Sequence, residues 1–392
     1  MTSRIDVDAD VAVIGGGPAG LSAAIILARM GLSTIVIEAA AAKGFRIGET
    51  APPSLQPLLL RLGVWESFLA GGHLRTGAIG SAWGEENLAW RDSFTHPLGS
   101  GWHLDRAGFE RMLACKAEAA GVTLLIGNRV VGVEREQGYA EPEARWSVQL
   151  RQQDGQPRRT TAAFLLDASG RSALIARQCD GAPVHVDRLM CAYAVLSLSS
   201  GTPQNLHSLI ESAADGWWYA AQLPDGNVLV ALFTDAAILR RLSCFEFGAW
   251  QNLLFQTRHI SAFLDGSVAA CSGQTKIAVN SASSHCLQRM YGPGWAAAGD
   301  AATAWDPLAS AGIVQAVRSG IESADAIQAS LAGNQNLLAA YQERIQQAFT
   351  RYLYERRAYY ALEKRWPDSP FWSIRSGVTQ SGSVKLRSRI LR

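Results

Sequence analysis

The stretch VAVIGGGPAG, residues 11–20, decides the fold. Its first four residues form an all-apolar run, which is typical of a strand buried on both faces of a parallel sheet. A helical pattern follows and ends near Gly31, and a second apolar run at 34–37 ends at Glu38. A G-x-G-x-x-G motif between a strand and a helix, with an acidic residue after the next strand, predicts a βαβ unit that binds a dinucleotide.

Each residue of this motif has a separate role in such a unit. We expect Gly15 to allow the tight turn, Gly17 to let the backbone approach a pyrophosphate, and Gly20 to let the helix pack on the strand. Pro18 and Ala19 open the helix, whose unpaired N–H groups would face the phosphates. The loop therefore predicts a phosphate-binding turn.

The acidic residue narrows the choice of dinucleotide. Glu38 can accept hydrogen bonds from both ribose hydroxyls, which disfavours a 2′-phosphate there. No second G-x-G-x-x-G follows a strand, because the glycine pairs at 99–101 and 292–294 lack the third glycine and the helix. The motif alone leaves NAD and FAD open.

Composition excludes several classes of protein. The chain has 392 residues, of which 48% are hydrophobic and 18% charged, so it is not a disordered chain. The net charge of +2 gives no indication of nucleic-acid binding. Residues 351–392 hold ten Lys and Arg against three Asp and Glu. Such a basic region is either a solvated face or a contact with a partner or membrane surface.

Cysteine usage and the N-terminus indicate location. The six cysteines form no CxxC pair and have no metal-ligand spacing, so we expect a reduced protein with no metal site. Residues 1–10 contain three Asp and no apolar core of a signal peptide. The apolar stretch 11–32 is interrupted by glycines and a proline, so it predicts no membrane span. A cytoplasmic protein is expected.

Several ordered motifs resemble the FAD-dependent monooxygenases of the para-hydroxybenzoate hydroxylase type, which include the flavin-dependent halogenases. They are the N-terminal motif with Glu38, LLDASGRS at 165–172, GWAAAGDAA at 294–302 and DPLASAG at 306–312. The second departs from the family's Asp-Gly pattern, because Ala-Ser separates Asp167 from Gly170.

Further segments resemble a halogenase-like branch of that family. They are RIGETAPP at 46–53, SAWG at 81–84, GWHLDR at 101–106, GWWY at 216–219 and RWPDSPFW at 365–372. The branch is similar to the flavoprotein monooxygenases that hydroxylate a tryptophan residue in a partner subunit during tryptophylquinone maturation.

The resemblance implies an α/β fold of the glutathione-reductase-like flavoprotein type. A Rossmann-type FAD-binding domain would comprise residues 1–182 and 286–330, and an antiparallel-sheet substrate domain residues 183–285. A C-terminal helical region with a basic tail would comprise residues 331–392. Strand patterns at 189–198, 216–223, 227–234 and 274–279 agree with the second domain.

The resemblance also implies the residues that would contact FAD. The expected set is Gly15, Gly17, Pro18, Ala19, Gly20, Glu38, Arg46, Arg106, Val131, Asp167, Gly299, Asp300, Pro307, Ala311 and Gly312.

The aromatic run at 217–219 is the expected substrate wall. Trp217, Trp218 and Tyr219 alternate across a strand, so at least one should face the pocket, and ordinary sheet core is the alternative. Glu49 is the candidate general base, and Trp218 a second candidate catalytic residue. Glu49 can instead make a structural hydrogen bond to a loop amide.

The expected reaction is hydroxylation of an electron-rich aromatic, an indole or phenol, through a C4a-hydroperoxyflavin. The substrate is free or held on a peptide or carrier protein, and electrons come from NAD(P)H or from external reduced flavin. Halogenation is disfavoured because no lysine lies between Glu49 and Asp105. A flavin oxidase or dehydrogenase, and a flavin-bearing maturation factor that binds a partner polypeptide, remain alternatives. A separate reductase is a further candidate partner.

Overall fold

The computed structural model describes residues 5–41, 44–92, 96–136, 145–198, 206–264 and 275–376. The predicted basic tail after residue 376 lies outside the described residues, as does Gln274 of the predicted strand 274–279. Among the described helices, none is long and apolar enough to cross a membrane.

The first sheet is built around the predicted strand–loop–helix unit. Its strands run in the order β19-β20-β11-β1-β2-β8, and all neighbours except β19 and β20 are parallel. Their bounds are β1 Ile5–Ile14, β2 Thr34–Glu38, β8 Thr123–Ile126, β11 Pro157–Asp167, β19 Tyr291–Gly292 and β20 Trp295–Ala297. The antiparallel strands β9 (Asn128–Arg135) and β10 (Trp146–Gln152) extend this sheet from β11. The parallel Rossmann-type sheet is confirmed.

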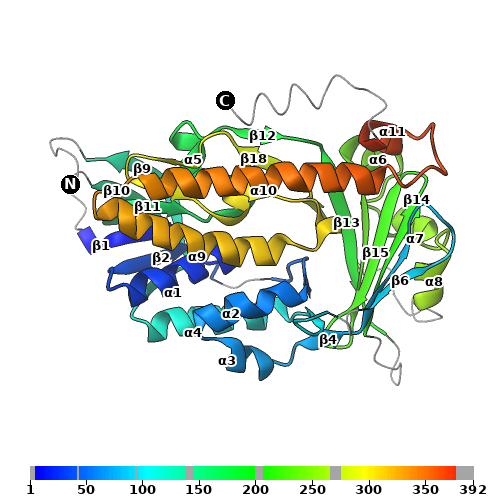
Figure 1. The fold of residues 1–392 in the computed structure, drawn as a ribbon, viewed down its shortest axis with the longest axis horizontal. Helices are drawn as coiled ribbons and strands as arrows, with labels where there is room; N and C mark the ends of the chain where they lie inside the picture. Colours follow the sequence, from blue (N-terminus) through cyan, green and yellow to red (C-terminus); the bar gives the residue numbers. More distant parts are fainter. Residues whose placement is uncertain are drawn as a thin grey trace.

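Long helices cover this sheet. α1 (Pro18–Arg29) packs against α9 (Gly312–Leu331) and against α4 (Arg106–Ala119). α10 (Asn336–Tyr360) packs beside α9 and continues to the second sheet, as Figure 1 shows. The apolar faces of α1, α4 and α9 bury the core on this side of the sheet.

The second sheet has the strand order β17-β13-β16-β15-β14-β5-β6. The bounds are β5 Ala78–Ala82, β6 Ala89–Asp92, β13 Leu189–Leu196, β14 His207–Ala213, β15 Gly216–Gln222, β16 Val228–Asp235 and β17 Ala278–Ser281. All pairs are antiparallel except β14 with β5. The antiparallel sheet is therefore confirmed, and residues 78–92 add two strands from outside the predicted substrate domain.

Short elements complete the two layers. The small sheets are β3-β7-β4 (Thr50–Ala51, Gly101–His103, Leu74–Thr76) and β12-β18-β21 (Pro183–His185, His285–Leu287, Thr303–Ala304). The remaining helices are α2 Gln56–Leu62, α3 Trp65–Leu69, α5 Leu174–Gln178, α6 Ala236–Arg241, α7 Phe247–Leu254, α8 His259–Phe263 and α11 Pro370–Ser376.

The C-terminal helices connect the two layers. α10 buries Tyr341 in the core of the first sheet, and its last residue, Tyr360, in the core of the second. Phe371 and Trp372 of α11 join Tyr360 there. The helical C-terminal region thus fixes the second sheet against the first, and the cavity described below lies between them.

Candidate active site

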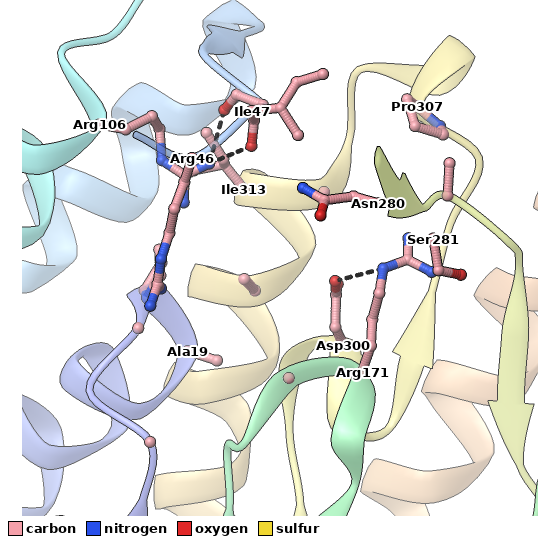
Figure 2. A pocket seen from close by; sticks show the side chains of 18 of the residues that line it. Ala19, Arg46, Ile47, Arg106, Arg171, Asn280, Ser281, Asp300, Pro307 and Ile313 are labelled. Atoms are coloured by element: carbon pink, nitrogen blue, oxygen red, sulfur yellow. Dashed lines mark hydrogen bonds and ion pairs between the residues drawn. The ribbon is translucent and has the colours of Figure 1, made fainter. Parts of the chain in front are cut away.

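A cavity of about 620 Å³ extends from the glycine loop after β1 to the second sheet. Its walls come from the ends of β1, β2 and β11, the loop at 46–50, the loop before α9, and strands β13 to β17 of the second sheet. In Figure 2, Arg46 and Arg106 lie on one side and Asp300 and Arg171 on the other, with Ala19 and Ile313 in the view between them.

The glycine loop has the conformation that the motif predicts. Gly15 has φ +112°, and a Cβ there would lie 2.2 Å from the Ala168 carbonyl oxygen. A Cβ on Gly20 would lie 2.0 Å from the Gly15 oxygen, so this glycine allows the close packing of α1. A Cβ on Gly17 would meet no heavy atom within 4 Å, because Gly17 faces the cavity.

Glu38 lines the cavity at the end of β2. Its Oε2 accepts a hydrogen bond from the Gly16 N–H (2.8 Å), and its Oε1 accepts one from the Ala40 N–H (2.9 Å). A carboxylate accepts about four hydrogen bonds, so both oxygens can still accept hydrogen bonds from ribose hydroxyl groups. The backbone contacts hold the carboxylate at the cavity wall.

Arginine side chains form one side of the cavity. Arg106, the first residue of α4, donates from Nη1 to the Gly48 carbonyl (2.8 Å) and from Nη2 to Glu110 Oε1 (2.9 Å). Arg46 lies 3.6 Å from Glu110 Oε2 through its Nη1. The buried Glu110 thus aligns two guanidinium groups beside the cavity, where they can balance the charge of a diphosphate.

The Gly-Asp turn forms the facing side. Gly299 has φ +62°, and a Cβ there would lie 2.7 Å from Ala19 Cβ, so the turn packs directly on α1. Asp300 follows, lines the cavity and pairs with Arg171 (Oδ2 to Nε, 3.5 Å). Its carboxylate is placed to accept hydrogen bonds from hydroxyl groups of a bound ligand.

Asp167 is fully buried beneath the cavity floor. Its Oδ2 accepts from the N–H groups of Ile175 and Ala176 (both 2.8 Å), and its Oδ1 accepts from Ser169 Oγ (2.6 Å). Burial raises the pKa of Asp167, and these hydrogen bonds oppose that shift. The residue holds the turn between β11 and α5.

Glu49 and Tyr219 meet at the second sheet. Tyr219 Oη donates to Glu49 Oε1 (2.5 Å), and the Gly48 N–H donates to Glu49 Oε2 (3.1 Å). Thr50 Oγ1 lies 2.5 Å from Tyr219 Oη. Burial, together with the Glu49 charge, raises the pKa of Tyr219 well above its ordinary value, so the phenol stays protonated. Glu49 is 2% exposed and lines the cavity.

The strand alternation of β15 separates the three aromatic residues. Trp217 and Tyr219 line the cavity, and the Trp217 ring stacks on Phe233 with centroids 4.0 Å apart. Trp218 faces the opposite side of the sheet and contacts Trp250 (5.2 Å). At least one aromatic side chain therefore reaches the pocket, and Trp218 is not among those that line it.

A buried ionic network supports the loop before α9. Asp306, which lines the cavity, accepts at Oδ2 from Arg356 Nε (2.9 Å) and from Tyr360 Oη (2.9 Å). Arg356 also donates to Asp187 Oδ2 (2.7 Å). Tyr360 Oη accepts from the Trp217 indole N–H (3.0 Å). α10 thereby ties this loop to the aromatic wall.

The cavity brings together most of the predicted cofactor residues. Those that line it are Gly15, Gly17, Pro18, Ala19, Glu38, Arg46, Arg106, Asp300, Pro307 and Gly312. Gly20, Asp167 and Gly299 do not line the cavity but shape its wall by close packing or hydrogen bonds, and Ala311 is not among the lining residues. Val131 is 48% exposed, and its neighbour Val130 lines the cavity instead.

Sequence reasoning missed other lining residues. They include Asn128 and Arg129 of β9, Arg171 after β11, Cys191 of β13, Ile210 of β14, Phe233 of β16, and Asn280 and Ser281 of β17. Arg171 stands within the quoted 165–172 motif, so its position could have been found. The other positions depend on long-range strand pairing, for which the sequence has no local signal.

These residues fit a dinucleotide flavin. The cavity begins at the N-terminus of α1, where N–H groups and two arginines suit a diphosphate, and continues past Asp300 to an aromatic chamber. Gly17 leaves room for close approach of a phosphate. Among the described residues, no group of three His, Cys, Asp or Glu side chains could hold a metal ion. The fold and site are those of a flavoprotein oxidoreductase.

The chain belongs to the FAD binding domain family, which matches residues 8–355. It is 28% identical over 375 residues to the putative FAD-dependent oxidoreductase LodB of Marinomonas mediterranea, covering 93% of this chain and 96% of LodB. It is 26% identical to a tryptophan 2-halogenase of Chondromyces crocatus, covering 93% and 70%. The protein is therefore an FAD-dependent oxidoreductase.

Solved structures show the same fold. The myxobacterial chondrochloren halogenase CndH superposes with a TM-score of 0.83 at 23% identity, covering 97% of this chain and 88% of CndH. The peptidyl tryptophan dihydroxylase QhpG, which is essential for tryptophylquinone cofactor biogenesis, superposes with a TM-score of 0.74 at 26% identity, covering 95% and 80%. The expected FAD-binding family is confirmed, and similar proteins include named halogenases.

Proposed function

We propose that this flavoprotein is a monooxygenase that hydroxylates an electron-rich aromatic, an indole or a phenol. The observation that carries the proposal is the Glu49–Tyr219 pair in the aromatic part of the FAD cavity. FAD, when bound, would supply the activation of oxygen. The protein would supply orientation, exclusion of water and placement of a proton.

The chamber suits a flat substrate that carries one hydrogen-bond donor. Trp217 and Phe233 offer stacked aromatic surface, and Cys191 and Ile210 complete an apolar wall. Glu49 already accepts from Tyr219 and from the backbone, which leaves lone pairs for an indole N–H or a phenol O–H. Such a contact would orient the ring and draw electron density toward the carbon that is oxidised.

Glu49 would act as the general base in this proposal. It would accept the proton of the substrate N–H or O–H as the ring is oxidised, while Tyr219 keeps its own proton and stabilises the carboxylate. We leave Trp218 out of the catalytic set, because it faces the other side of the sheet. Trp217 takes its place as the aromatic wall residue.

Halogenation is the second candidate, because similar proteins include several named halogenases. No lysine of the described residues lines the cavity, and its cationic residues are arginines. An arginine stays protonated, so it cannot serve as an amine that captures hypohalous acid. The absence of lysine from residues 49–105 also favours hydroxylation over halogenation.

The identity of the substrate carrier is part of the proposal. QhpG acts on a peptidyl tryptophan, so a tryptophan within a polypeptide is a substrate to test beside free indoles and phenols. We propose that electrons come from NAD(P)H directly or from a separate flavin reductase. Cytoplasmic location is likewise proposed.

Anaerobic mixing with NADH or NADPH is the first test, with loss of the oxidised-flavin absorbance as the readout. Fast bleaching supports direct reduction, and no bleaching supports a separate reductase. Reduced enzyme is then given isotopically labelled oxygen, chloride or bromide, and candidate aromatics. Labelled oxygen in the product supports hydroxylation. A halogenated product, or oxidised substrate with stoichiometric peroxide and no label, would contradict it.

The variant Glu49→Gln tests the residue assignment. We expect it to retain FAD and to lose turnover by about 100-fold or more, the usual contribution of a general base. The matched control is Glu66→Gln, since Glu66 is exposed on α3 and is not among the lining residues. Unchanged turnover in Glu49→Gln would contradict the assignment of Glu49 as the general base. Its role would then be structural, through its hydrogen bond to the loop amide.

A further inference from the structure

A row of tryptophans leads from the cavity wall to the surface. The ring centroids of Trp217 and Trp83 are 6.3 Å apart, those of Trp83 and Trp372 5.2 Å, and those of Trp372 and Trp366 6.1 Å. Trp217 lines the cavity, and Trp366 is partly exposed. We call these four residues the tryptophan row.

The row is assembled from segments far apart in the sequence. Trp217 belongs to β15, Trp83 follows β5, Trp372 belongs to α11 and Trp366 precedes α11. Trp83 and Trp372 are each fixed by an indole N–H that donates to a backbone carbonyl, of Tyr359 and Ala213 respectively (both 2.9 Å). These hydrogen bonds hold the Trp83 and Trp372 rings in their positions within the row.

The cavity end of the row is held in place by a chain of hydrogen bonds. The Trp217 indole N–H donates to Tyr360 Oη (3.0 Å), which donates to Asp306 Oδ2 (2.9 Å). Arg356 donates from Nε to the same Asp306 oxygen (2.9 Å), so the charge of this carboxylate is balanced and the chain holds the indole in place. Trp217 is the member of the row that lines the cavity, so it is the first ring of the row that an oxidant in the cavity meets.

We propose that the tryptophan row conducts oxidising equivalents out of the FAD cavity. A reduced flavin that reacts with oxygen without substrate releases hydrogen peroxide, and one further electron from reduced flavin converts peroxide into hydroxide and a hydroxyl radical. The row protects the cavity from them. This role needs reduced flavin and oxygen, and it does not depend on which aromatic the enzyme oxidises.

The electron balance is simple. A hydroxyl radical in the cavity takes one electron from the Trp217 ring and, with one proton, becomes water. Trp83 returns an electron to Trp217, Trp372 to Trp83, and Trp366 to Trp372. A thiol or ascorbate in solution then reduces Trp366 and releases one proton. Each step joins rings at the separation usual for packed aromatic pairs.

Peptide mass spectrometry after uncoupled turnover tests the proposal. FAD-loaded enzyme is reduced and exposed to oxygen without aromatic substrate, with catalase present to remove peroxide from solution. We expect oxidised tryptophan to accumulate at Trp366, with Trp217 spared, and ascorbate to lower the oxidation of Trp366. Preferential oxidation of Trp217 in the wild-type enzyme would overturn the proposal.

Breaking the row gives the sharper comparison. In Trp83→Phe, oxidation should shift from Trp366 to Trp217, because phenylalanine is much harder to oxidise than tryptophan. An unchanged pattern would overturn the proposal. The matched control is Trp250→Phe, since Trp250 is buried on the other face of the second sheet. The same shift in that control would also overturn it.

A second variant covers the case in which Trp83→Phe does not bind FAD. In Trp372→Phe the break falls one step later, so oxidation should accumulate at Trp83 and Trp217 and fall at Trp366. Oxidation of Trp366 at the wild-type level in this variant would overturn the proposal. Retained flavin absorbance shows that each variant still carries its cofactor.

Discussion

At the scale of single residues, Gly17 carries the most direct test of the FAD site. It lines the cavity beside the N-terminus of α1, and a side chain there would extend into the cavity. We predict that Gly17→Asp abolishes FAD binding, because a carboxylate would occupy the space of the diphosphate and repel its charge. The measurement is the flavin absorbance of the purified protein.

A glycine outside the cavity supplies the control for this change. Gly248 lies near the start of α7, is exposed, and a Cβ there would meet no heavy atom within 4 Å. Gly248→Asp should therefore bind FAD as the wild-type chain does. A yellow Gly17→Asp protein would contradict our placement of the diphosphate.

The FAD half of the site follows from local sequence, and the substrate half does not. The glycine loop and Glu38 are local features, because the motif specifies their backbone and spacing. On β15 and β9 it was predictable that successive side chains point to opposite faces. Which of the two sets faces the cavity was not predictable. Trp217 and Val130 line it, while Trp218 and Val131 point away. The set of side chains that faces the cavity depends on how the strand packs in the folded protein, which is a long-range property.

At the scale of elements, the crossing of α1 and α9 fixes the cavity floor. A Cβ on Gly320 would lie 2.2 Å from the Ala19 carbonyl oxygen, and neither backbone can move without shifting a helix. We predict that Gly320→Ala destabilises the protein by roughly 1–3 kcal/mol and weakens FAD binding. Urea unfolding and FAD titration measure the two effects.

The same substitution at an exposed position of another helix should act in the opposite direction. Gly248→Ala adds a methyl group to α7 with no heavy atom within 4 Å. Alanine is the better helix former, by about 1 kcal/mol, so this variant should be as stable as the wild type or more so. A stable Gly320→Ala protein would mean that the two helices can separate without cost.

The ionic network of α10 is the second element-scale prediction. Arg356 is buried between Asp306 and Asp187, with Oδ2 distances of 2.9 and 2.7 Å. Arg356→Met leaves two buried carboxylates without their cation, and we predict a loss of roughly 3–5 kcal/mol of stability. Denaturant unfolding measures it, and Arg351→Met, at an exposed position of α10, is the control.

The outcome at Arg356 also tests the loop before α9. Since Asp306 lines the cavity, loss of its cation should raise the dissociation constant for FAD as well. Destabilisation with unchanged FAD affinity would mean that the loop keeps its position without the network.

At the scale of the whole molecule, the fold class was predictable and the composition of the second sheet was not. The strand patterns matched β13, β15 and β16, because each is an apolar run bounded by turns. β14 joins that sheet as a hairpin with β15, and the β5–β6 hairpin joins it through the parallel pairing of β5 with β14, across more than a hundred residues. No local pattern specifies such pairing.

Two buried histidines predict how the stability of the whole protein depends on pH. His103 and His285 are 0% and 2% exposed, and burial lowers the pKa of each from 6.5 to about 4. His103 Nε2 contacts Ser208 Oγ, and His285 Nε2 contacts the Asp300 carbonyl oxygen. Both are therefore neutral in the folded protein at neutral pH.

A depressed pKa means that the unfolded chain binds the extra protons. The contribution of each neutral histidine to the free energy of unfolding is then full above pH 6.5, and it is lost as the pH falls from 6.5 toward 4. The total loss is on the order of 3 kcal/mol for each histidine. We predict that the free energy of unfolding of FAD-saturated enzyme falls between about pH 7 and about pH 5 by roughly 2 kcal/mol per histidine. His103→Gln and His285→Gln should each flatten this dependence, whatever their stability at neutral pH. An equal slope in the wild type and both variants would show that neither imidazole is held neutral by the fold.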